Sequence, residues 1–193
     1  MLTTKDKILD ATISYFKQEP DLSSVSISNI ARKANIGKST VYEHFENKQT
    51  LIKETYIYLL DKYQSMLLSE IKENNFKKAL LNQLSKILDV MEDAKVIMEV
   101  IMNAHSEMNF AQFDQCSVKI RLIQEKMTKR FNEIFLIGVQ ADQVHPTNRP
   151  YKNNIVQALI SGLMFQYVDN KIDIERNELL QLIYKEIIHI VES

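Results

Sequence analysis

The residues of this chain that could bind another molecule gather in one short stretch, residues 38–48. Lys38 and Lys48 each lie at the predicted start of a helix. There a lysine and the unpaired backbone N–H groups can together bind an anion such as phosphate. Tyr42 and His44 lie between them and point outward from a predicted helix. The stretch therefore predicts a local anion-binding patch.

Patterns for catalysis and for metal binding are missing from the sequence. The four histidines are scattered, and there is no HExxH pair, no paired Glu-x-x-His and no Gly-rich phosphate loop. Cys116 is the only cysteine, which excludes an internal disulfide and a thiolate metal cluster. We therefore expect that the protein is not an enzyme, with no catalytic residue, no metal site and no cofactor.

The elements that must position the patch are predicted to be helices. The sequence holds three glycines and three prolines, with no Gly between residues 38 and 137 and no Pro between 21 and 145. A β-rich chain of this length would need turn signals about every 8–12 residues. The fold class is therefore predicted to be all-α, with about nine helices.

Two short predicted helices, 27–34 and 38–45, have the size of a helix-turn-helix. Ser26 is a good N-cap for the first helix. Asn35 stands at its end, where a left-handed residue is needed, and Asn tolerates that conformation. The residues expected to pack between the two helices and in the turn are Ile30, Ala31, Ala34, Ile36, Val41 and Phe45.

Residues 26–51 resemble the DNA-binding domain of the TetR family of bacterial transcriptional repressors. The matching features are an Ile-Ala pair, a Lys-x-Thr-hydrophobic-Tyr run, an x-His-Phe end, and the x-Lys-x-x-Leu opening of the next helix. The pattern covers about 50 residues at the N-terminus. Asn35 replaces the usual turn Gly, Gly37 the usual Ser or Thr cap, and Ser39 a residue that is often Gly or Pro.

The resemblance implies that the helix from Lys38 enters the major groove of double-stranded operator DNA. It also implies that Tyr42 and His44 reach the DNA backbone, while Ser39 and Thr40 lie nearest the base edges. The full set of residues expected at DNA is Ser26, Lys38, Ser39, Thr40, Tyr42, His44 and Lys48.

We expect residues 1–47 to form the DNA-binding domain and residues 48–193 to form a larger helical domain for ligand binding and dimerisation. The longest amphipathic stretch carries Phe113, Ile120, Met127 and Ile134 at seven-residue spacing. The helices predicted in the second domain span residues 47–72, 76–92, 94–104, 107–139, 149–169 and 174–191.

The last two predicted helices are apolar over more of their circumference than one core needs, which indicates a homodimer through a four-helix bundle. Internal packing alone is the alternative. Gly162 costs about 1 kcal/mol inside a helix relative to Ala, so a close helix approach would explain it. The expected interface residues are Ile155, Leu159, Gly162, Phe165, Leu180, Ile183, Tyr184 and Ile187.

Methionines and aromatic residues of the middle helices could line an adaptable apolar pocket for an unknown small-molecule effector. A stripe of such residues at helical spacing is more often plain core. The pocket residues that we predict are Met98, Met102, His105, Phe110, Phe113, Met127, Phe131 and Tyr167.

The charge balance limits how DNA could be bound. Lys plus Arg is 24 and Asp plus Glu is 25, for a net charge of −1, while residues 28–48 hold four basic and two acidic residues. This argues against DNA binding driven by an overall positive charge and in favour of binding through specific side-chain contacts. Apolar runs are too short for a membrane span, so we expect a cytoplasmic protein without a membrane partner.

These observations predict a TetR-like transcriptional regulator, with repression the expected direction. It would bind a palindromic operator as a dimer and be released by a small-molecule ligand. A helical protein-interaction module and an activator of the same family are the alternatives.

Overall fold

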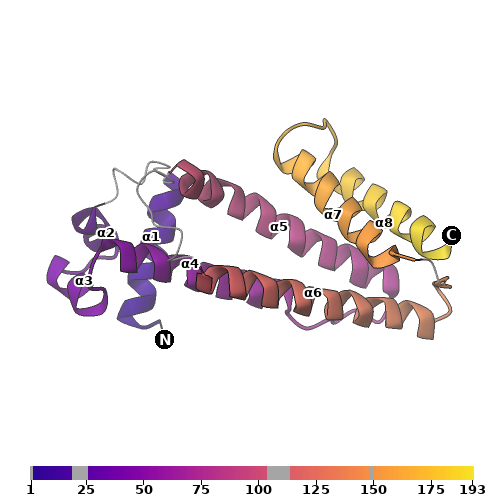
Figure 1. The fold of residues 1–193 in the computed structure, drawn as a ribbon, viewed down its shortest axis with the longest axis horizontal. Coiled ribbons are helices and arrows are strands. Elements are labelled where there is room, and N and C mark those ends of the chain that lie inside the picture. The colour runs from indigo at the N-terminus through magenta and orange to yellow at the C-terminus, as the bar shows by residue number, and fades with distance from the viewer. Residues whose placement is uncertain (1, 19–25, 104–113, 148–149) are drawn as a thin grey trace. The chain divides into compact units, whose positions relative to one another are not determined.

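The computed structural model describes residues 2–18, 26–103, 114–147 and 150–193, which form eight α-helices and no strand (Figure 1). The all-α prediction is confirmed for this part of the chain. The helices are α1 (Thr4–Gln18), α2 (Ile27–Lys33), α3 (Lys38–His44), α4 (Lys48–Leu67), α5 (Phe76–Asn103), α6 (Asp114–Gln140), α7 (Lys152–Val168) and α8 (Arg176–Glu192).

The prediction of about nine helices was wrong in one place, because the two helices expected at 76–92 and 94–104 are the single helix α5. The acidic pair Glu92-Asp93 does not interrupt it, since neither residue breaks a helix and both carboxylates find partners outside α5. Glu92 pairs with Arg176, and Asp93 accepts a hydrogen bond from the Tyr63 hydroxyl at 2.9 Å. Burial, together with this carboxylate, raises the pKa of Tyr63.

The chain divides into two compact units, each assembled from segments that are distant in sequence. The first unit comprises residues 1–65 and 93–123, and the second comprises residues 66–92 and 124–193. Both α5 and α6 therefore contribute to each unit.

The first unit places α1, α2 and α3 around a small apolar core, with α2 packed against both α1 and α3. The aromatic ring of Phe16 is fully buried and stacks on Tyr56 with ring centroids 6.0 Å apart. The largest fully buried side chains of this unit are Ile8, Phe16, Ile30, Phe45 and Leu51.

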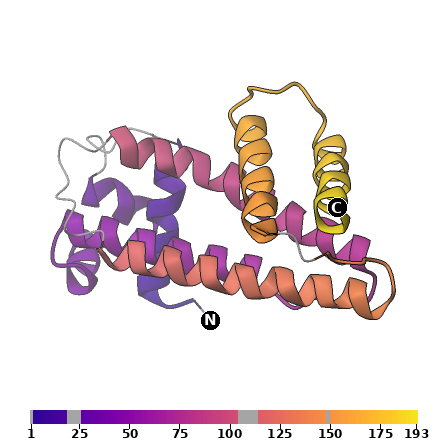
Figure 2. The same cartoon turned by 45° about the vertical axis from the view of Figure 1, so that its right-hand side comes forward.

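The second unit is built on α5, α6 and the paired helices α7 and α8, which lie side by side in both views (Figure 2). Leu80, Leu84 and Leu88 recur every four residues of α5, so they fall on one helix face and are all fully buried. The core that they enter also contains Phe76, Ile134, Met164, Leu179, Ile183 and Ile187.

Helix α6 approaches the start of α5 closely at Gly138, in the last turn of α6. A Cβ atom at Gly138 would lie 2.8 Å from the Phe76 ring and 3.0 Å from Val144. A larger residue at this contact would therefore force the Phe76 ring to shift.

None of the helices in the described segments is long and apolar enough to cross a bilayer.

Candidate nucleic-acid interface

The first helix of the helix-turn-helix begins at a side-chain cap. The Ser26 backbone is extended, and its hydroxyl accepts a hydrogen bond from the Asn29 N–H at 3.1 Å. This confirms the predicted N-cap. Because Ser26 is used to cap α2, its hydroxyl lies at the start of the helix beside the unpaired N–H groups there.

The turn between α2 and α3 is closed by a left-handed residue, as predicted. Asn35 has a φ of 56°, and the Ile36 N–H donates to the Ala31 carbonyl at 3.0 Å. Gly37 is the N-cap of α3 and offers no side-chain hydrogen bond. The turn therefore depends on the backbone and on the tolerance of Asn for positive φ.

Core residues fix which face of α3 points outward. Val41 is fully buried and Phe45, just after the helix, is 1% exposed, so the two lock α3 onto the rest of the first unit. Ile30 and Ala31 of α2 are buried opposite them. These four placements are those expected from the sequence.

The outward face of α3 carries the side chains predicted to meet DNA. Tyr42 is 49% exposed, and the Lys38 ammonium lies 5.9 Å from the centre of its ring. Ser39 and His44 are exposed, and Thr40 is half-buried. The structure thus leaves a lysine, a phenol, an imidazole and two short hydroxyls accessible along a seven-residue helix, together with the exposed carboxylate of Glu43.

Helix α4 begins beside this face with its own cap. The Asn47 side-chain oxygen accepts hydrogen bonds from the Thr50 N–H at 2.8 Å and from the Thr50 hydroxyl at 3.0 Å. Lys48, the first residue of α4, is half-buried. Helices α3 and α4 therefore each open with a lysine in the first turn, an arrangement that suits phosphate groups.

The predicted interface residues of α7 and α8 separate into two groups. Leu180 is 7% exposed and Ile183 and Ile187 are fully buried, so all three belong to the core of the second unit. Gly162 is exposed, Phe165 is 56% exposed, and Ile155, Leu159 and Tyr184 are half-buried.

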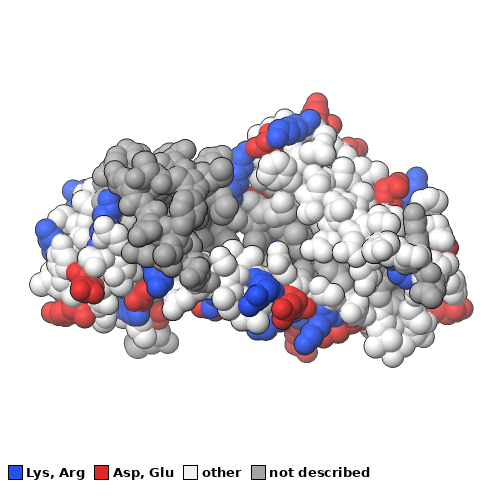
Figure 3. Space-filling view, in the orientation of Figure 1, with Lys and Arg blue, Asp and Glu red and all other residues white. Residues whose placement is uncertain are grey.

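Helix α7 is unusual for a surface helix because it has no charged residue after Lys152. Surface helices normally carry charged and polar residues on their solvent side. Here the exposed side includes Ala158, Gly162 and Phe165, and the surface over α7 is largely white in Figure 3.

Of the predicted effector-pocket residues, His105, Phe110 and Phe113 lie outside the described residues. Met98 and Met102 lie in α5, but their side chains also fall outside the described part of the chain. Met127 and Phe131 are half-buried on α6, and Phe131 packs against the core of the second unit.

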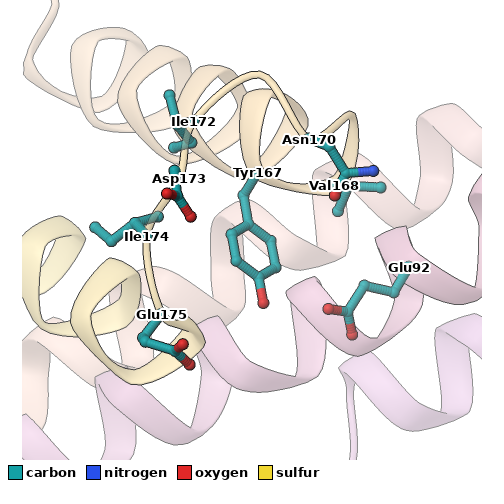
Figure 4. Close-up of a pocket in the computed structure, with 8 residues that line it drawn as sticks. All are labelled: Glu92, Tyr167, Val168, Asn170, Ile172, Asp173, Ile174 and Glu175. Carbon is teal, nitrogen blue, oxygen red and sulfur yellow. The ribbon is translucent and has the colours of Figure 1, made fainter.

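Tyr167 lines a pocket of about 330 Å³ between the end of α7, the loop of residues 169–175 and α5. Its ring points down from α7 toward Glu92 and Glu175 (Figure 4). The remaining lining residues are Val168, Asn170, Ile172, Asp173 and Ile174.

The polar lining of this pocket is not predictable from the sequence. Glu175 belongs to the loop before α8 and Glu92 to α5, so only the folded second unit brings them to Tyr167. In the sequence, Asp173 and Glu175 have an ordinary explanation as acidic residues at the start of a helix.

Comparison with known proteins finds similarity both in the N-terminal region and over most of the chain. Residues 8–55 match the model of the family described as bacterial regulatory proteins, tetR family. The uncharacterized HTH-type transcriptional regulator YxbF of Bacillus subtilis is 24% identical over 172 residues, which cover 88% of this chain but 40% of YxbF. The chain thus spans less than half the length of that relative.

A second relative is the biofilm operon icaADBC HTH-type negative transcriptional regulator IcaR of Staphylococcus aureus. It is 23% identical over 131 residues, covering 67% of this chain and 70% of IcaR. Among solved structures, a TetR transcription regulator from Haloarcula marismortui superposes with a TM-score of 0.66 at 14% identity, covering 97% of this chain and 96% of the other.

The matched N-terminal region is a helix-turn-helix of the kind found in DNA-binding transcriptional regulators, and the chain shares the all-helical fold of such proteins. Residues 8–55 are therefore assigned to the family of bacterial regulatory proteins, tetR family.

Proposed function

We propose that this protein is a transcriptional repressor that binds a palindromic DNA operator as a homodimer and leaves it when a small molecule binds. In this proposal residues 1–47 are the DNA-binding domain and residues 48–193 the ligand-binding and dimerisation domain. The observation that carries the proposal is the outward face of α3, where Lys38, Tyr42 and His44 are exposed while Val41 is buried.

The chemistry of that face suits DNA. Lysine and the N–H groups of the first turns of α3 and α4 would hold phosphates, and the Tyr42 hydroxyl would donate to a phosphate oxygen. Ser39 and Thr40 would lie nearest the bases, where short hydroxyls discriminate less than arginine does. Part of the sequence preference would then come from DNA shape and half-site spacing.

A homodimer is supported by the uncharged, exposed side of α7. A Cβ atom at Gly162 would meet nothing within 4 Å among the residues that the structure describes, so packing against them does not account for this glycine. A partner helix crossing closely at Gly162 would account for it, and it would also cover Phe165. Two copies joined there would present two recognition helices to one duplex.

Repression is supported by the similarity to IcaR, and effector release is supported by the pocket at Tyr167. IcaR, a negative regulator by its description, aligns with 67% of this chain. The pocket at Tyr167 offers a volume of about 330 Å³ for a small molecule. Release would require that the molecule bind more tightly to a conformation that fits the operator poorly. We place the protein in the cytoplasm, where its DNA would be.

Selection from a pool of random double-stranded DNA tests the proposal. The purified full chain should enrich a palindrome whose half-sites lie about one helical turn apart, roughly 34–36 Å. An enriched site without symmetry would contradict dimeric binding, and no enrichment at moderate salt would contradict DNA recognition. A small molecule that releases the selected DNA from the wild type but not from Tyr167→Ala would support the effector site.

A further inference from the structure

Helices α1 and α2 border a surface cavity of about 480 Å³ that lies within the first unit. The described residues that line it are Tyr15, Gln18, Asn29, Arg32 and Lys33. None of these five residues is acidic, and two of them carry a positive charge. All five lie outside the set that the sequence predicts at DNA, so the cavity is a separate feature of this unit.

The two positive charges of the cavity have no carboxylate partner in the described part of the chain. The Arg32 guanidinium donates to the Asn29 side-chain oxygen at 3.2 Å. The Lys33 ammonium donates to the Ser14 carbonyl at 3.3 Å and to the Gln18 side-chain oxygen. All of these partners are neutral, whereas two other lysines of α1 pair with carboxylates. The charge at the cavity is therefore left for a molecule from outside the chain.

The hydrogen bonds inside the cavity occupy its acceptors and leave donors over. The side-chain oxygens of Asn29 and Gln18 already accept from Arg32 and Lys33, and the Tyr15 hydroxyl oxygen accepts from the Asn29 amide at 3.4 Å. A guanidinium has five N–H donors and an ammonium has three, and the recorded bonds use fewer than half of them. Positive charge with surplus N–H donors suits a ligand that supplies acceptors only, which is an oxyanion.

We propose that this cavity is an anion site that binds one phosphate group. The planar guanidinium of Arg32 matches two phosphate oxygens at once, and the Lys33 ammonium adds a point charge beside it. A carboxylate offers two oxygens in one plane, whereas a phosphate offers oxygens on several sides. Two neighbouring cations of one helix turn can therefore each bind a different oxygen of a phosphate.

A phosphate group can reach the cavity from two sources. Arg32 and Lys33 belong to the last turn of α2, and Lys38 begins α3 after a short turn. The cavity and the proposed DNA-binding face thus belong to the same helix-turn-helix, which makes the DNA backbone one source. That source rests on the proposed function. The other source is a free molecule that carries phosphate, and it is independent of DNA binding.

Titration of the full chain with inorganic phosphate tests the site in the absence of DNA. The side-chain N–H signals of Arg32 and Asn29 in NMR spectra report binding, and acetate at equal ionic strength is the competing anion. We expect phosphate to shift both signals and to bind at least about five-fold more tightly than acetate.

Three variants assign the binding to the cavity. Arg32→Met and Lys33→Met should each weaken phosphate binding at least about five-fold, read from the Asn29 amide signal. Lys7→Met should leave it unchanged, because Lys7 is an exposed lysine of α1 that does not line the cavity. Arg32 and Lys33 are exposed, so their variants should fold, and unfolding curves check this.

Operator affinity at several salt concentrations then identifies the source of the phosphate group. If the DNA backbone supplies it, Arg32→Met should bind the selected operator more weakly, with a salt slope shallower by about 0.9 for each phosphate no longer neutralised. An unchanged affinity and slope would assign the site to a free molecule that carries phosphate.

Two results of the titration would overturn the anion site. One is a wild type that binds phosphate no more tightly than acetate. The other is phosphate binding by Arg32→Met and Lys33→Met that equals that of the wild type. A wild type that selects no DNA would overturn the proposed function alone, because the phosphate titration uses no DNA.

Discussion

At the scale of single residues, the proposed DNA-binding face depends on which side chains of α3 are left exposed by the core. Val41 and Phe45 are the residues that anchor α3, and their burial turns Lys38 and Tyr42 outward. The ammonium of Lys38 and the ring of Tyr42 lie close together, so both can address the same stretch of DNA backbone. Because the net charge of the chain is near zero, specific contacts of this kind would matter more for DNA binding than overall electrostatic attraction.

Lys38→Ala should weaken binding to all DNA sequences by a similar factor, because a lysine that binds phosphate reads no sequence information. The slope of log affinity against log salt should become shallower by about 0.9 for each phosphate that the variant no longer neutralises. Titrations at several salt concentrations measure this slope. A change of preferred sequence with an unchanged salt slope would contradict a phosphate role and assign Lys38 to the bases.

Asp6 gives a pH-dependent prediction for α1. Its carboxylate accepts a hydrogen bond from the Thr3 N–H at 2.9 Å, and this bond lowers the pKa of Asp6 below its usual value. The stabilisation is therefore complete above the unfolded-state pKa of about 3.9 and is lost as the pH falls through the folded-state value. Asp6→Ala should be less stable than the wild type at pH 6, and the gap should narrow below pH 4 in acid unfolding curves.

At the scale of helices, local patterns predicted local structure well. The caps at Ser26 and Asn47 and the left-handed Asn35 were predictable because each depends on residues within three positions along the chain. Seven-residue spacing was a poorer guide to α6. Ile134 is fully buried and Ile123 is 9% exposed, but Ile120 is 45% exposed. A straight helix repeats nearer eleven residues than seven, so a heptad pattern drifts off the buried face.

Gly138→Ala should destabilise the second unit, because the added methyl would lie 2.8 Å from the Phe76 ring. Overpacking of this kind costs about 1–3 kcal/mol, which exceeds the gain of about 1 kcal/mol from replacing glycine inside a helix. Chemical denaturation of the two proteins gives the difference directly. An alanine variant as stable as the wild type would show that Phe76 can move away at no cost.

At the scale of the whole molecule, the sequence could not indicate how distant segments combine. Both units draw on α5 and α6, and the pocket at Tyr167 takes Glu92 from α5 and Glu175 from the loop before α8. No spacing rule relates residues that are some 80 positions apart. The sequence did predict correctly that α7 and α8 are strongly apolar, but it could not separate residues of the internal core, such as Ile183, from residues left at the surface, such as Phe165.

The Gly162→Ala variant distinguishes a glycine needed for packing within one chain from a glycine needed at a dimer interface. No described atom of the chain lies within 4 Å of the added methyl, so the isolated chain should gain up to about 1 kcal/mol of stability. If a partner helix crosses at Gly162, the same methyl should weaken the dimer. Sedimentation across a range of concentrations measures this, with Gln157→Ala, another exposed position of α7, as the control. If the added methyl leaves the dimer dissociation constant unchanged, the interface does not include Gly162.

The affinity of Tyr42→Ala for the selected operator tests the central claim most directly, since Tyr42 lies at the middle of the proposed DNA-binding face. Tyr151→Ala is the matched control, because Tyr151 is 80% exposed at the start of α7 in the second unit. We predict that Tyr42→Ala, while remaining folded, binds the operator at least about ten-fold more weakly, and that Tyr151→Ala binds as the wild type does. A folded Tyr42→Ala protein with full operator affinity would contradict recognition of DNA through α3.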